Sequence, residues 1–354
     1  MPRCPLLLSR SQILRYRQVV GLLDVRMPFD AAPIRTAAWA GLQDSVPRAA
    51  LLSIHARVSG AASAAWEDPS LVQFWGPRYR AYVAASADLA VFTLGRLARD
   101  TRGLTRARET AAHMRSVLGR RSPPYGDVGR SMGVSPNSLR YAAPTGTVVM
   151  RWDGARQPTI RMVRQPEMEP ESARVELVRR FLRIFGPGTV VSYAKWAGVS
   201  MADAIVSWRS LESSLTRVQT PLGEAWILAE DETAFTRKLS LCIGTRLLPS
   251  GDAYSLLWGA DRALLVPTPK HRALLWTTRV WPGALLLDGE IVGVWRRADA
   301  EVSIETWRRL TRTECETVEA EVRSLPLPGV KGPLTLRLSG AGAAESKLRA
   351  QTRP

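Results

Sequence analysis

An order of three helices followed by a hairpin occurs twice in this chain, and it limits the fold more than any other feature. In the first copy, Ser135 caps the third helix and Pro136 occupies its first position, where no amide hydrogen is needed. A polar segment, 153–158, then separates two short strands. The predicted elements of this copy are helices over about 105–118, 127–132 and 136–141, and strands over 147–152 and 159–163. This order is typical of a winged helix, whose third helix usually enters the major groove of DNA.

The second copy covers residues 174–230 and follows the same plan. Thr189 and Ser200 are placed to cap two successive helices. A hairpin over 216–228 with a Pro-Leu-Gly turn closes the copy. Its charges are nearly balanced, so a scaffold role is as consistent with the sequence as DNA contact. The acidic, proline-bearing stretch 166–173 before it is interpreted as a linker.

The remaining segments extend this pattern in both directions. A hairpin around Asp288-Gly289 has a favoured two-residue turn. The other predicted elements are helices over about 9–21, 32–40, 47–60, 88–99 and 312–325, and a strand over 79–86. We therefore predict an α+β fold with tandem winged-helix domains and a β-rich C-terminal part. The predicted division is an N-terminal helical, winged-helix-like region (1–100), a basic winged helix (101–165), a second winged helix (174–245), a β-rich region (246–325) and a flexible tail (326–354).

The charge of the chain points to a polyanionic partner. Its 354 residues carry a net charge of +17, with 44 arginines and only five lysines. A GC-rich genome explains most of the arginine-to-lysine ratio, but it does not explain the surplus of positive over negative charge. Residues 101–165 alone hold twelve arginines and three acidic residues, which is over half of the net charge. Nucleic acid is the partner that such a distribution favours.

The sequence also narrows the compartment and the cofactors. No apolar run approaches the roughly 20 residues of a membrane helix, and the N-terminus lacks a signal-peptide cleavage pattern. Cys4, Cys242 and Cys315 are unclustered, which favours a reduced cytoplasm over a disulfide framework or a zinc site. We expect a cytoplasmic, nucleoid-associated monomer that uses no cofactor, no metal and no membrane.

Candidate DNA contacts come first from the basic winged helix. Asn137 and Arg140 belong to its predicted recognition helix, and Arg156 to the tip of its wing. The other expected contacts are Arg57, Arg130, Arg151, Arg209 and Arg217. The alternative is a structural winged helix whose exposed arginines only maintain solubility. Arginine affinity for phosphate favours DNA contact.

Three stretches, taken in order, resemble the AlkZ-like DNA glycosylase family. They are Ala40–Ser45 with His55–Arg57, Leu177–Thr189 with Tyr193–Val199, and Arg246–Pro249 with Leu287–Arg297. Each alone is weak, but their order and spacing match the family over about residues 8–325. The resemblance implies tandem winged helices and a β-rich C-terminal part, in agreement with the element pattern.

The resemblance also implies a site in the Gln43-Asp44-Ser45 turn. Family members excise alkylated purines, including crosslinked ones, with a Gln-apolar-Gln or Gln-apolar-Asp motif. Gln43 falls on the first glutamine, Asp44 on the apolar position and Ser45 on the last position. An N-alkylated purine is already a good leaving group, so the enzyme must place a water near C1′ and stabilise an oxocarbenium-like transition state. In an extended turn, Gln43 and Ser45 would share one face.

The alternative for this turn is purely structural. Asp44 and Ser45 have the residue types that cap helices, and Pro47 opens a helix directly after them. His55, on the same helix, is more consistent with a packed histidine than with a DNA contact.

Two hypotheses about function follow. The first is a monofunctional, metal-free glycosylase in which Gln43 positions water and Asp44 or Ser45 assists. The second is a non-catalytic DNA-binding protein on the same scaffold, either a damage sensor or a transcriptional regulator. Both expect double-stranded DNA as the partner and an affinity that falls steeply with salt. A scaffold protein without nucleic acid would show no such salt dependence.

Overall fold

The computed structural model describes residues 5–46, 48–154, 156–237, 244–330 and 332–340. Cys4, Cys242, Pro47 and the last fourteen residues of the predicted tail lie outside these ranges. Helices and strands are mixed throughout, so the predicted α+β class is confirmed. Within the described ranges, no helix combines the length and apolar character needed to cross a bilayer.

The N-terminal helices form where the sequence predicts them. They are α1 (Arg10–Val20), α2 (Ala31–Ala37), a 3-10 turn η1 (Ala38–Ala40) and α3 (Ala49–Arg57). Ser9 and Gln12 form a reciprocal capping box at the start of α1, and the helix ends before Gly21. The predicted helix over 9–21 is therefore confirmed.

One sheet joins the N-terminal region to the basic winged helix. Its strands, in the order β2-β4-β3-β5-β6, are β2 (Leu42–Gln43), β4 (Ala81–Ala85), β3 (Leu71–Trp75), β5 (Val148–Arg151) and β6 (Thr159–Met162). β3 and β5 meet at a single pair, Gln73 opposite Met150. This pairing crosses the boundary predicted at residue 100. β3 was missed because its sequence, Leu-Val-Gln-Phe-Trp, does not alternate between polar and apolar residues.

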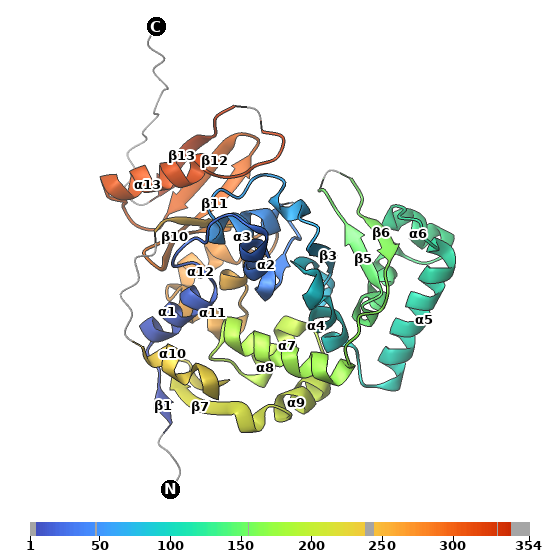
Figure 1. Cartoon of the computed structure of the whole chain (residues 1–354). Coiled ribbons are helices and arrows are strands. Elements are labelled where there is room, and N and C mark those ends of the chain that lie inside the picture. The colour runs from blue at the N-terminus through green and yellow to red at the C-terminus, as the bar shows by residue number, and fades with distance from the viewer. Residues whose placement is uncertain (1–4, 47, 155, 238–243, 331, 341–354) are drawn as a thin grey trace.

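Residues 101–165, here called the basic unit, have the expected order of elements. They contain α5 (Thr101–Leu118), α6 (Tyr125–Ser131), η6 (Pro136–Thr145) and the β5–β6 hairpin. The third helix is a 3-10 helix and not the predicted α-helix. Pro136 begins it and Pro144 lies inside it, where the proline cannot donate a helical hydrogen bond. In Figure 1, α5, α6, β5 and β6 form a lobe at one side of the molecule.

The second copy, here called the aromatic unit, spans Pro170–Leu228. It contains α7 (Pro170–Phe185), α8 (Val190–Ala197), α9 (Met201–Arg209), β7 (Leu215–Thr220) and β8 (Gly223–Leu228). Thr189 and Ser200 accept hydrogen bonds from backbone amides in α8 and α9, so both predicted caps are confirmed. α7 begins inside the stretch 166–173 that was interpreted as a linker, because Pro170 suits the first turn of a helix. β1 (Leu6–Leu7) pairs in parallel with β7.

The C-terminal part is a five-stranded sheet covered by one helix. Its strands, in the order β13-β12-β11-β10-β9, are β13 (Thr335–Gly340), β12 (Glu301–Thr306), β11 (Glu290–Ala298), β10 (Gly283–Leu287) and β9 (Arg246–Leu248), and the helix is α13 (Arg312–Arg323). Asp288 and Gly289 have the positive φ values of the expected hairpin turn.

The prediction of a flexible tail over 326–354 is wrong for residues 335–340. They form β13, which pairs in parallel with β12. Leu336 and Leu338 pack against the buried residues of this sheet. A partner strand about thirty residues away in the sequence supplies order that local composition does not reveal.

Short helices connect these parts. They are α4 (Leu89–Thr93), α10 (Glu232–Thr236), α11 (Arg262–Leu265) and α12 (Pro269–Leu275). The predicted helix over 88–99 is thus only partly formed, since a 3-10 turn over Leu94–Arg96 follows α4. The largest group of buried apolar residues is built around α7 and α8 and extends to β4, α4 and the C-terminal segment. The aromatic unit therefore lies at the centre of the core.

Candidate nucleic-acid interface

The Gln43–Ser45 turn is held against β4 by the backbone. The amide of Asp44 donates to the carbonyl of Ala81 over 2.7 Å. Gly41, just before the turn, has φ 70°, and a side-chain carbon there would lie 2.8 Å from the ring of Phe92. Only glycine lets the chain pass this ring in that conformation. Local packing thus fixes where the turn begins.

Asp44 is buried and fully engaged. Its Oδ1 accepts from the amide of Ala50 at 3.0 Å, and its Oδ2 accepts from Nε2 of Gln73 at 2.7 Å. Burial raises the pKa of Asp44 to about 6, although these hydrogen bonds and the charge of Arg48 oppose the rise. Since Ala50 lies in the first turn of α3, the structural alternative is confirmed for Asp44, whereas Ser45 Oγ has no partner among the described residues and caps no helix.

Gln73 links this turn to the β5–β6 hairpin. While its Nε2 donates to Asp44, its Oε1 accepts from the backbone amide of Trp152 at 2.5 Å. Gln73 is only 5% exposed. Because an amide donates on one side and accepts on the other, these two partners fix its orientation. The position of Trp152 is therefore coupled to the carboxylate of Asp44.

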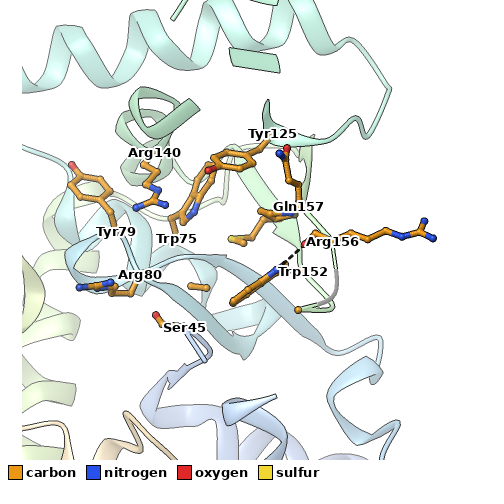
Figure 2. A pocket seen from close by; sticks show the side chains of 13 residues that line it. Ser45, Trp75, Tyr79, Arg80, Tyr125, Arg140, Trp152, Arg156 and Gln157 are labelled. Atoms are coloured by element: carbon orange, nitrogen blue, oxygen red, sulfur yellow. Dashed lines mark hydrogen bonds between the residues drawn. The ribbon is translucent and has the colours of Figure 1, made fainter. Parts of the chain in front are cut away.

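A cavity of about 490 Å³ lies between the turn and the hairpin. Aromatic side chains line much of it, namely those of Trp75, Tyr79, Tyr125 and Trp152. Figure 2 shows Trp75, Tyr125 and Trp152 around a common space, with Ser45 at its lower edge. The volume lies in the range of sites that enclose a small organic ligand. Flat rings of this kind can stack on a nucleobase, which contributes about 1–3 kcal/mol per base.

The polar lining of the cavity is cationic and amide in character. The side chains concerned are those of Ser45, Arg80, Arg140, Arg156 and Gln157. Ser45 Oγ and Arg140 Nε are both buried, and neither has a hydrogen-bond partner among the described residues. Both residues line the cavity, and an unpartnered buried polar atom is uncommon in a folded protein.

Gln43 and Ser45 do not share this cavity. Ser45 lines it, whereas Gln43 is absent from the lining. The amide of Gln43 lies next to Gly251, where a side-chain carbon would fall 2.7 Å from Gln43 Nε2. β2 ends at Gln43, so the alternation that would place both side chains on one face does not continue. The prediction of a shared face for these two residues is therefore wrong.

The basic unit presents several of the predicted DNA contacts. Arg140 and Arg156 line the cavity, and in Figure 2 the Arg156 side chain extends away from it. Asn137 is exposed on η6. Arg130 is exposed on α6 and forms an ion pair with Asp127. These four residues remain candidate contacts because solvent, and hence DNA, can reach them.

Arg151 is also accessible, but it is already partnered. Its guanidinium lies 3.6 Å from the ring centroid of Trp66 and forms an ion pair with Glu67 at 2.8 Å. Arg48 lies on the same ring at 3.8 Å. This arrangement places two arginines on one indole ring.

Arg57 is not available to DNA, so its prediction as a contact is wrong. It is 2% exposed and pairs with buried Asp252 through two hydrogen bonds of 2.7 and 2.9 Å. Arg57 also holds the carbonyls of Gly21 and Ser53. Its charge lowers the pKa of Asp252 against the opposing effect of burial. The pair joins α3 to the C-terminal part.

The two candidates in the aromatic unit lie on its surface. Arg209 is exposed at the end of α9. Arg217 is exposed on β7 and pairs with Glu224 at 3.2 Å. Neither lines the cavity beside Ser45.

His55 is a packed residue, as the sequence favoured. It is 3% exposed, and its Nε2 lies 3.1 Å from Oγ of Ser324. Burial lowers the pKa of His55 to about 4. Within the described ranges there is no group of His, Cys, Asp and Glu side chains arranged to hold a metal ion.

Sequence reasoning missed most of the cavity wall. Its aromatic residues Trp75, Tyr79, Tyr125 and Trp152 come from the end of β3, the β3–β4 loop, the start of α6 and the position after β5. The signal that could have found them is the enrichment of tryptophan and tyrosine beside glycine and proline turns. Such residues converge only when the sheet brings β3 and β5 together.

The profile of the family described as DNA glycosylase AlkZ-like matches residues 128–326, which is more than half of the chain. The chain belongs to this family. The resemblance inferred from the sequence is thereby confirmed. The matched range begins after the Gln43–Ser45 turn, so membership of the AlkZ-like family rests on the basic unit, the aromatic unit and the C-terminal sheet.

A sequence comparison and a structural comparison place the chain further. The interstrand DNA cross-link repair glycosylase of Streptomyces sahachiroi is 28% identical over 159 residues, which are 43% of this chain and 42% of that protein. The alignment thus spans less than half of that relative. The solved structure of Streptomyces sahachiroi DNA glycosylase AlkZ matches with a TM-score of 0.76 over 94% of this chain and 100% of that chain, at 18% identity. At that identity the likeness establishes a common fold.

Proposed function

We propose that this AlkZ-like protein binds double-stranded DNA and hydrolyses the N-glycosidic bond of bulky alkylated purines. The observation that carries the proposal is the aromatic, arginine-lined cavity against Ser45, in a chain that belongs to a glycosylase family. The basic unit supplies the positive charge that attracts the duplex.

The cavity suits a nucleotide that has left the base stack. An enzyme that acts at C1′ reaches its target most readily when the nucleotide is extruded from the duplex. Trp75, Tyr125 and Trp152 offer ring faces to the extruded base. A purine alkylated at N7 is cationic, and aromatic faces attract cations. The volume of about 490 Å³ leaves room for a bulky substituent on the base.

Ser45 and Asp44 divide the chemistry between them in this proposal. Ser45 Oγ, which has no partner among the described residues, orients a water toward C1′. The water oxygen bonds to C1′ as the bond from C1′ to nitrogen breaks. The bonding electrons neutralise the departing cationic purine, and the proton of the water passes to solvent. Asp44 directly precedes Ser45 and places a negative charge behind the developing oxocarbenium.

Asp44 is suited to an electrostatic role and not to proton abstraction. Both its oxygens already accept hydrogen bonds, from Ala50 and Gln73. A pKa of about 6 leaves most of the carboxyl groups ionised at pH 7.5. Gln43, which faces Gly251, has a supporting part at most in this scheme.

A second candidate is a non-catalytic DNA-binding protein, such as a damage sensor. The observation that favours it is the separation of Gln43 from the cavity, which leaves Ser45 as the one residue of the turn in the described lining. Such a protein would hold the extruded base without releasing it.

The test is base release from a duplex that carries a bulky N7-alkylguanine. We expect release by the wild type and a loss on the order of a hundredfold for Ser45→Ala and for Asp44→Asn. Arg337→Gln, which lies on β13 outside the cavity lining, should retain the wild-type rate. Tight binding of the modified duplex without release by the wild type would establish the second candidate instead.

A further inference from the structure

We propose that Arg48 and Arg151, held on the ring of Trp66, bind a backbone phosphate of DNA beside the cavity wall. The proposal rests on the proposed DNA binding and names the groups that hold the strand beside the extruded nucleotide. No pattern in the sequence singles out Arg48 or Trp66.

The two guanidinium groups share one support. Their central carbons lie 3.8 Å and 3.6 Å from the ring centroid of Trp66, which is itself 5% exposed. Because both groups contact one indole, they lie close to each other. Besides burial, the charge of Arg48 lowers the pKa of Arg151, so the two like charges repel, and a phosphate that reaches both would relieve the repulsion.

The backbone of Arg48 has an unusual, left-handed conformation where its side chain meets Trp66. Arg48 has φ 67° and ψ 15°, a left-handed conformation that costs a residue with a side chain about 1–2 kcal/mol. Arg48 directly precedes α3, but its side chain forms no capping hydrogen bond with that helix. Its Nη1 instead donates to the carbonyl of Trp152 at 3.3 Å. Strain of this kind persists where surrounding structure requires it.

Glu67 holds Arg151 through an exchangeable contact. The side chains are 49% and 53% exposed, and such pairs contribute about 0–1 kcal/mol. Burial lowers the pKa of Arg151 and Arg48 lowers it further, while Glu67, Asp153 and Asp44 raise it. A phosphate offers oxygens that match the guanidinium fork. We therefore expect the phosphate to replace Glu67 when DNA binds.

The chain connects this arginine pair to the cavity at two points. Ser45 precedes Arg48 by three residues, and Trp152 follows Arg151 directly. Ser45 and Trp152 both line the cavity. Arg48 Nη1 also contacts the carbonyl of Trp152, so the arginine pair lies beside a residue of the cavity wall.

The first arm of the test measures binding of a fluorescent duplex with one N7-alkylguanine across a range of salt. We expect Arg48→Gln/Arg151→Gln to bind about tenfold more weakly near 0.15 M salt. Its slope of log K against log salt should be smaller by about 0.9, the value for one phosphate. Arg337→Gln is the matched control, because Arg337 also lies on a strand, pairs with a half-exposed glutamate, Glu301, and is not a candidate DNA contact. Circular dichroism verifies folding, and the two single variants replace the double variant if it unfolds.

The second arm locates the phosphate. Methylphosphonate linkages, which are uncharged, are introduced one at a time on both sides of the lesion. A methylphosphonate at one of these positions should weaken DNA binding by the wild type and leave DNA binding by the double variant unchanged, as expected in a double-mutant cycle. Inorganic phosphate is added in parallel. If it competes at millimolar concentration with no position-dependent effect of methylphosphonate, the arginines bind free phosphate and the proposal is overturned.

The third arm uses Glu67. If a phosphate displaces it, Glu67→Gln should bind DNA several-fold more tightly, whereas Glu301→Gln, which removes the partner of Arg337, should not. The phosphate site would be overturned if the wild type and the double variant had the same slope of log K against log salt and the same sensitivity to methylphosphonate. Absence of base release with these effects intact would overturn only the glycosylase proposal. Absence of salt-dependent DNA binding by the wild type would overturn both.

Discussion

The basic unit and the aromatic unit have the same order of elements and opposite physical characters. In the aromatic unit, Phe181, Phe185, Tyr193 and Trp196 form a buried cluster with ring centroids 5.4 to 6.5 Å apart. In the basic unit, the largest aromatic side chains instead line an open cavity. The same topology thus builds the centre of the core in one copy and a surface for a ligand in the other.

Their arginines differ in the same way. In the aromatic unit, Arg174, Arg180 and Arg183 pair with carboxylates, and Arg180 is 6% exposed. In the basic unit, Arg130 and Arg151 also pair with carboxylates, but their side chains are 75% and 49% exposed, and Arg140 has a buried nitrogen without a partner among the described residues. Element order therefore says where a helix lies, while burial and charge decide what it does.

The largest effect should come from the aromatic cluster. Trp196→Ala removes a side chain that is 1% exposed and should lower the free energy of unfolding by about 3–5 kcal/mol. Urea denaturation measures the loss. Val191→Ala, at a position of α8 that is 46% exposed, is the control and should change little. A small effect of Trp196→Ala would break the contrast between core and surface copies.

Substitution of the buried arginine Arg57 should lower the free energy of unfolding, as substitution of a core residue does. Arg57→Gln leaves Asp252 buried without its cation and should cost about 3–5 kcal/mol of unfolding free energy. Exposed Arg209→Gln should cost under about 0.5 kcal/mol. Thermal unfolding of both variants tests this. Equal stability of the two would mean that the ion pair with Asp252 is not formed in solution.

The free energy of unfolding should depend on the protonation of Asp44, which joins the Gln43–Ser45 turn to the basic unit through Gln73. The pKa of Asp44 is raised from 3.8 to about 6, so its contribution to stability is fully present below pH 3.8 and is lost as pH rises through 6. The loss amounts to about 3 kcal/mol. Urea denaturation between pH 4 and 7 should show the stability of wild type relative to Asp44→Asn falling as pH rises. Parallel profiles would show that the carboxyl is not buried.

His55 should act in the opposite direction over the same range. Its pKa is lowered from 6.5 to about 4, so its contribution is fully present above pH 6.5 and is lost as pH falls through 4. Comparison of the wild type with His55→Gln separates the two groups.

The smallest effect on stability is expected for two arginines in the third helix of each unit, Arg140 and Arg209. Their substitution should differ in its effect on DNA binding. Arg140→Gln should weaken binding of modified duplex by about 1–2 kcal/mol, because Arg140 lines the cavity. Arg209→Gln, at the end of α9, should leave binding nearly unchanged. Fluorescence anisotropy at fixed salt measures both. Equal losses would show that the aromatic unit also contacts DNA.

Local chemistry was sufficient to predict much of the fold. The capping box at Ser9, the caps at Thr189 and Ser200, and the Asp288-Gly289 turn act within a few residues of themselves, so the sequence carries their whole cause. The type of the η6 helix was missed, although Pro144 was visible in the sequence. β13 was missed because its order comes from pairing with β12.

The candidate site was predicted only in part for the same reason. Capping by Asp44 could be offered as an alternative to a catalytic role because its partner, Ala50, is six residues away. The burial of Arg57 depends on Asp252, which lies 195 residues further along the chain. No local pattern distinguishes an arginine that will meet a distant carboxylate from one that will meet DNA.

The sequence by itself determined the family, the order of the elements and the surplus of positive charge, because these are properties of composition and of neighbouring residues. Tertiary structure alone decided which arginines face solvent and that Ser45, not Gln43, lines the cavity. It also decided that Gln73 couples the turn to Trp152. Each of these depends on the β3–β5 pairing or on contacts with the C-terminal part, which join residues that are far apart in the chain.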